Sequence, residues 1–126
     1  MNEPKISIYG RLLDITIQSM LLIIEKMFPE NRVTVIEQGT TLLSDGNVFE
    51  CSIESNEEAF GESMYLAGHF YDNKNLFKDF LNKFIDELEK IHSIYDLDYE
   101  IKDENEYTEF NIRHPAFGER YNPPMS

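Results

Sequence analysis

The chain contains little cysteine, little basic charge and no long apolar run. Its 126 residues include one cysteine, Cys51, so no disulfide can form within the chain. Lysine and arginine together number 11 against 24 aspartates and glutamates, which gives a formal net charge of −13. Because that charge repels phosphate groups, direct binding to DNA or RNA is unfavourable. The composition indicates a protein of a reducing compartment whose partner is not a nucleic acid.

The apolar runs are too short and too broken for a membrane span. The longest one, from Leu12 to Phe28, is interrupted by polar and charged residues throughout. The first five residues lack the basic and apolar regions of a signal peptide. We therefore expect a cytoplasmic protein without a membrane partner.

Motifs that carry common chemistries are also missing. The chain has no glycine-rich phosphate loop, no G-x-S-x-G elbow and no H-E-x-x-H pair. Its three histidines, His69, His92 and His114, lack metal-ligand spacing. Alternate acids from Asp96 to Glu100 could hold a divalent cation, but no EF-hand spacing supports this. We predict neither a metal nor another cofactor, and expect the protein not to be an enzyme.

What the chain does contain is enough apolar material for one folded domain. Apolar residues make up 41% of the sequence and include nine phenylalanines and seven tyrosines, which excludes a disordered acidic tail. We predict a single α+β domain over residues 1–126, with an irregular tail containing Pro and Gly from about residue 114. Cys51 lies on an alternating strand, where a lone cysteine is usually a small buried residue.

Two segments have the periodicity of amphipathic helices. Apolar residues recur at helical spacing from Asp14 to Phe28, with Asp14 as a possible N-cap and Pro29 as a stop signal. Residues 13–17 also alternate as a strand would, so the start of this helix is left open. A longer apolar stripe predicts a second helix over 75–92, capped by Asp72 or Asn73.

The remaining segments alternate as strands do. Gly68 is expected to mark a bulge or a close contact, and an acidic loop is expected over 56–61. Turns are expected at 45–47 and 103–105. The expected strands are a short strand or extended arm near Ile6 and Ile8, then 32–38, 48–55, 62–71, 95–102 and 106–113. The order (β)αβββαββ predicts a two-layer sandwich, in which two amphipathic helices pack on one face of a mainly antiparallel sheet of five to six strands.

The acidic residues are concentrated outside the predicted helices. Residues 1–29 and 73–92 each have a net charge of zero, whereas residues 30–72 carry nine acids and one base, and residues 93–126 carry eight acids and three bases. The sheet face opposite the helices should therefore hold many of these acids. The side chains predicted to form a binding surface there are Glu50, Glu54, Tyr65, Tyr71, Asp98, Glu100 and Tyr107.

Two interpretations of this surface compete. It is either a solvated face that keeps the protein soluble, or a docking face for a basic protein partner. In size, charge and fold class the chain is similar to small bacterial immunity proteins. That resemblance implies neutralisation of a toxin, often a basic nuclease, through an acidic surface, and it assigns no role to any residue.

The leading hypothesis is therefore a non-catalytic, protein-binding module that acts as an immunity or inhibitor protein and occludes a basic partner such as a nuclease toxin. The alternative is a small enzyme or ligand-binding domain with a pocket near His69 or His114. Exposed strand edges also allow a homodimer.

Overall fold

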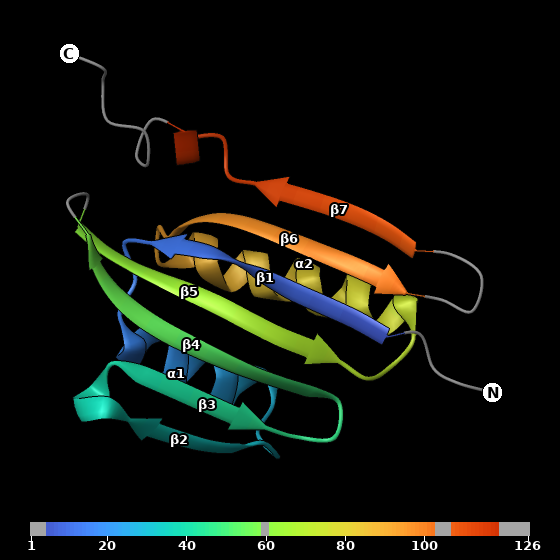
Figure 1. Cartoon of the computed structure of the whole chain (residues 1–126), viewed down its shortest axis with the longest axis horizontal. Coiled ribbons are helices and arrows are strands. Elements are labelled where there is room, and N and C mark those ends of the chain that lie inside the picture. Colours follow the sequence, from blue (N-terminus) through green and yellow to red (C-terminus); the bar gives the residue numbers. More distant parts are fainter. Residues whose placement is uncertain (1–4, 59–60, 103–106, 119–126) are drawn as a thin grey trace.

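The computed structural model of the protein describes residues 5–58, 61–102 and 107–118. Over these residues the chain forms seven strands, two α-helices and one short 3-10 helix (Figure 1). The helices are α1 (Ile17–Met27), η1 (Glu37–Gly39) and α2 (Lys74–Lys90). The strands are β1 (Lys5–Leu13), β2 (Arg32–Ile36), β3 (Thr41–Asp45), β4 (Phe49–Glu58), β5 (Gly61–Phe70), β6 (Ile94–Lys102) and β7 (Tyr107–Arg113).

All strands of the described chain belong to one antiparallel sheet, in the order β2-β3-β4-β5-β1-β6-β7. The α+β class and the antiparallel sheet are confirmed, but the predicted count of five to six strands is wrong. The missing strand is β3, between η1 and the turn at 45–47. Its inward residues are Leu42 and Ser44, and a buried serine hides the apolar alternation by which a strand is recognised.

The first strand is longer and more central than expected. Instead of a short strand or arm, β1 spans nine residues and pairs with β5 on one side and β6 on the other. Asp14 does not cap α1. It adopts a left-handed conformation (φ 58°) just after β1, and Thr16 is the N-cap, whose hydroxyl accepts a hydrogen bond from the Ser19 amide. The alternation of residues 13–17 therefore reflects the end of β1 and the turn into α1.

Two further boundaries differ from the prediction. The segment expected to be an acidic loop is mostly paired, since β4 runs to Glu58, β5 begins at Gly61, and Glu57 lies opposite Glu62. Residues 59–60 and the expected turn at 103–105 lie outside the described residues. In the tail, Phe117 is buried.

Both helices cover the same face of the sheet. Figure 1 shows α1 behind β3 and β4, and α2 behind β1 and β6. Asn73 caps α2, as one of the two expected residues, through a hydrogen bond from the Leu76 amide.

Cys51 is buried beneath the helices, and burial raises the pKa of its thiol to about 12, which makes it a poor nucleophile. No helix of the described chain is long and apolar enough to cross a membrane.

Two glycines allow close packing in the middle of the sheet. A Cβ at Gly10 would lie 2.1 Å from the Asp96 carbonyl oxygen, so β6 can approach β1 only if this position has no side chain. A Cβ at Gly68 would lie 2.8 Å from the Glu50 carbonyl oxygen and 3.0 Å from Cβ of Cys51. Gly68 therefore marks a close contact. The register across it is continuous, so it is not a bulge.

We expect Gly10→Ala to lower the free energy of unfolding by about 1–3 kcal/mol, because the added methyl group forces β1 and β6 apart. Urea unfolding followed by circular dichroism measures the change. Gly118→Ala is the matched control, since nothing lies within 4 Å of a Cβ at that position. Equal stability of the two variants would contradict the importance of this close approach.

Candidate functional site: the open face of the sheet

The sheet face opposite the helices carries a regular array of polar side chains, which we call the open face. Because side chains alternate along a strand, each inward apolar residue is flanked by two residues of this face. The strand register aligns them into rows. One row runs across five strands from β4 to β7 and contains Glu50, His69, Ser7, Glu100 and Glu109.

All seven residues predicted to form the binding surface lie on or at the edge of the open face. They do not form one cluster. Glu50 and Glu54 lie on β4, and Asp98 and Glu100 lie on β6, with β5 and β1 between them. At about 4.8 Å per strand, the two acidic pairs are roughly 14 Å apart. The structure pairs Tyr65 with Glu54 in register.

Tyrosine hydroxyls hold several of these carboxylates in place. Tyr71 donates a hydrogen bond to Glu50. Glu100 accepts hydrogen bonds from Tyr9 and Tyr107, which lower the pKa of its carboxyl group. The Tyr107 hydroxyl also lies 3.0 Å from Oε1 of Glu109. These hydrogen bonds restrict the orientation of each carboxylate.

The same hydrogen bonds change the acidity of the tyrosines. The bond to Glu100 raises the pKa of Tyr9 to about 12, with smaller contributions from burial and from nearby acids. The pKa values of Tyr107 and Tyr71 are raised first by their bonds to Glu100 and Glu50. All three hydroxyls are therefore protonated donors at neutral pH.

Side chains of β7 bridge two acids of β6. Asn111 Nδ2 donates to Oδ1 of Asp96 and to Oδ1 of Asp98, at 2.8 Å each. Arg113 donates to Oδ2 of Asp96 at 2.9 Å, and its guanidinium carbon lies 5.3 Å from the ring centroid of Phe117. Asp96 is therefore paired with a cation within the protein, whereas Asp98 is held by the neutral amide of Asn111.

The alternate acids of β6 that were considered for a divalent cation are bridged by a side chain instead. The Asn111 amide nitrogen lies between Asp96 and Asp98. Within the described residues, no three His, Cys, Asp or Glu side chains come together as a metal site would require.

The open face is acidic, but less so than the whole chain suggests. Its acids outnumber its bases by seven to four among the described side chains. The acids are Asp45, Glu50, Glu54, Asp96, Asp98, Glu100 and Glu109, and the bases are Arg11, Arg32, Lys102 and Arg113.

Sequence reasoning missed Tyr9, Glu109 and Asn111 as members of the open face. Tyr9 was missed because β1 was expected to be a short strand or an arm. The alternation of Ile6 and Ile8 does point Tyr9 away from the core, so a signal was present. Nothing local indicates that Tyr9 meets Glu100, because the two residues come together only through strand pairing.

The two histidines considered for a pocket have different surroundings. His69 borders an open hollow of about 310 Å³ with Asp45, Glu50 and Ser52, and its Nδ1 lies 3.2 Å from Oγ of Ser7. His114 accepts a hydrogen bond from the Ala116 amide and packs edge-on against the Tyr95 ring. His114 therefore helps to fold the tail against the end of the sheet.

Comparison with known proteins gives no relative for this chain. No protein-family model matches it, and neither the curated proteins nor the solved structures include one with significant similarity.

We expect Glu100→Gln to lower the pKa of Tyr9 from about 12 towards its usual value of 10, because the negative charge beside the hydroxyl is lost. Tyr9 in the folded protein ionises at higher pH than in the unfolded chain, so its contribution to stability is complete below pH 10 and disappears as pH rises through 12. The variant should therefore lose less stability over this range than the parent.

An NMR titration of carbon-labelled tyrosine rings, assigned with Tyr9→Phe, measures this pKa. Glu54→Gln is the control, because Glu54 lies on the same face but makes no contribution to the Tyr9 pKa. A Tyr9 pKa that stays near 12 in Glu100→Gln would contradict the assigned contact.

Proposed function

We propose that the protein is a non-catalytic binding module that acts as an immunity or inhibitor protein, and that its open face occludes a basic partner such as a nuclease toxin. One observation carries the proposal. Carboxylates on an uncovered sheet face are held in fixed orientations by tyrosine hydroxyls, at Glu50 and around Glu100. A face that serves only solubility gains nothing from this ordering.

Ordering of the acids favours binding in two ways. A carboxylate already held by Tyr9 or Tyr107 loses little conformational freedom when a lysine or arginine of a partner approaches. The tyrosines also supply rigid, partly apolar contact area, and Tyr107 is 55% exposed. Binding therefore combines charge attraction with burial of aromatic surface, the usual composition of an interface hot spot.

The open face is large enough for a stable complex. Seven strands at about 4.8 Å spacing span roughly 29 Å, and strands of this length extend about 25 Å. The resulting area, on the order of 700 Å², approaches the surface of about 800 Å² that each partner contributes to a standard interface. A single partner can therefore cover both acidic pairs.

A basic protein fits this surface better than a nucleic acid does. Because its seven acids outnumber its four bases, the open face repels phosphate groups and attracts lysine and arginine. A protein that itself binds nucleic acid displays a surface rich in lysine and arginine. The acids of the open face would compete with phosphate groups for that surface. Association should be fast at low salt and slower as ionic strength rises.

The alternative function, a ligand-binding domain or small enzyme, is favoured by one observation, the hollow beside His69. Its lining includes Asp45, Glu50 and Ser52. The Glu50 carboxylate accepts a hydrogen bond from Tyr71, and the His69 ring has Ser7 as its hydrogen-bond partner. Docking of a protein accounts for more of the observed features than binding of a small ligand at this hollow does, because it involves the acids of both β4 and β6.

We expect a variant in which four open-face acids are replaced by Lys to bind the basic product of the neighbouring gene about 100-fold or more weakly. The four acids are Glu50, Glu54, Asp98 and Glu100. Isothermal titration calorimetry at low and high salt measures the affinity. Circular dichroism checks that the variant is folded.

The matched control changes four acids that lie outside the open face, Asp14, Glu25, Glu37 and Glu89, to Lys. Both variants alter the net charge by the same amount, so the control tests whether position matters. Equal weakening by the two variants would reduce the effect to net charge, and unchanged binding by the open-face variant would refute the charged-face mechanism.

A further inference from the structure

The two helices do not cover the whole of the sheet face on which they pack. They run antiparallel, with Lys26 beside Glu87 and Phe28 beside Phe80. α1 has 11 residues and is followed by Pro29, whereas α2 has 17 residues and continues past Phe80 towards its N-terminus by about two turns. Beyond the end of α1, α2 therefore has no neighbouring helix within the described residues.

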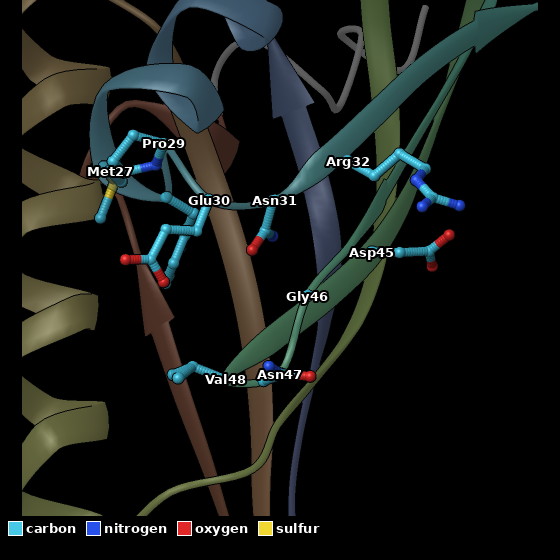
Figure 2. Close-up of a pocket in the computed structure, with 10 residues that line it drawn as sticks. Met27, Pro29, Glu30, Asn31, Arg32, Asp45, Gly46, Asn47 and Val48 are labelled. Atoms are coloured by element: carbon cyan, nitrogen blue, oxygen red, sulfur yellow. The ribbon is translucent and has the colours of Figure 1, made fainter.

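Two adjoining hollows occupy this position, and together we call them the α1-end hollow. One has a volume of about 500 Å³ and lies along α2 from Leu76 to Glu87. The other, of about 620 Å³, lies between residues 27–32 and 45–48. They share Met27, Phe28 and Val48. Figure 2 shows Met27 and Pro29 at the upper left and Val48 below them, on the side towards α2, while Arg32 and Asp45 lie on the right.

The floor of the α1-end hollow is aromatic. Phe28 stacks on Phe49 with ring centroids 5.1 Å apart and lies 5.5 Å from Phe80, which in turn stacks on Phe70 at 5.6 Å. The main phenylalanine cluster of the core thus reaches the surface here. At the sides, Val48 and Leu76 are 38% and 45% exposed, so apolar surface remains available for contact.

A hydrogen-bonded loop fixes the far wall of the hollow. Asn31 Nδ2 donates to Oγ of Ser44 and to the Phe49 carbonyl, at 2.9 Å each. Gly46 makes room for this side chain, since a Cβ there would lie 1.8 Å from Asn31 Oδ1. The segment after α1 is thereby tied to the β3–β4 turn, and the hollow is formed before any ligand arrives.

The rim of the hollow is acidic. Its lining contains six acids and three bases. Glu87 is neutralised by Lys26 and Lys90, each at 2.9 Å, and Lys90 also lies 3.6 Å from Asp86, whose side chain is 67% exposed. Asp79 and Asp86 are seven residues apart and therefore lie on one side of α2. The other lining acids are Glu30, Asp45 and Asp72, and the bases are Lys26, Arg32 and Lys83.

We propose that the α1-end hollow docks a short basic segment of a protein partner. One large apolar side chain of the segment lies on the phenylalanine floor, and flanking lysines or arginines meet Asp79, Asp86 and Glu30. The carbonyl groups at the end of α1 add negative potential at the same point. The phenylalanine floor lies on the helical side of the sheet, and the hollow shares Arg32 and Asp45, at its far end, with the open face.

Charge complementarity selects this occupant over others. A second copy of the chain, with a net charge of −13, would be repelled by the acidic rim. A free cation would gain nothing from the floor of Phe28, Phe70 and Phe80. Only a ligand that combines positive charge with an apolar side chain uses both features, and the volumes fall within the range of about 300–1,000 Å³ that is usual for ligand sites.

The test is an NMR titration of the nitrogen-labelled full chain with the capped peptide Arg-Lys-Leu-Phe-Lys-Arg. We expect chemical-shift changes confined to the surroundings of Met27, Val48 and Leu76. Peptides in which Ser-Ser replaces Leu-Phe, or in which Glu replaces every basic residue, should bind at least about fivefold more weakly. Leu76→Ser and Asp79→Lys should each weaken the first peptide to a similar degree.

Leu22→Ser and Glu25→Lys are the matched controls. Leu22 is 60% exposed on α1, and neither residue lines the hollow. The proposal is overturned if the three peptides bind equally, if the controls weaken binding as much, or if the shifts map to the open face. Dimerisation that Leu76→Ser abolishes, seen by sedimentation, would also overturn it in favour of a second copy.

Discussion

The sheet depends on β1, which pairs with β5 on one side and β6 on the other. Without it, the strands from β2 to β5 would share no ladder with β6 and β7 in the described chain. Ile6, Ile8 and Leu12 from this strand are completely buried beneath the helices. Gly10 lets β6 approach closely enough to pair. The first strand of the chain therefore joins two halves that are separated in sequence.

The same strand connects the two acidic regions of the open face. Tyr9 reaches the β6 side and donates to Glu100, while Arg11 lies in register between Tyr65 and Asp96. The array of acids and tyrosines thus depends on the same pairing as the core. A partner covering this face would contact residues from both halves of the chain, and its binding would stabilise the assembled sheet.

Helix length determines the surface on the other side. Because α1 ends before Pro29 while α2 continues, a hollow lies over one end of the phenylalanine cluster, where Phe28 is only partly buried. The open face offers ordered charge with tyrosines, and the α1-end hollow offers an aromatic floor with an acidic rim. Both favour basic ligands, but only the hollow requires an apolar side chain.

The sequence by itself determined the features that follow from a local repeat of apolar residues. Alternation assigned Glu50, Glu54, Asp98 and Glu100 to the face away from the helices, and helical spacing located α2, because both patterns depend only on near neighbours. Tertiary structure decided the rest. The place of β1, the extra strand β3 and the contact of Tyr9 with Glu100 all arise from pairing between distant segments, about which local periodicity carries no information.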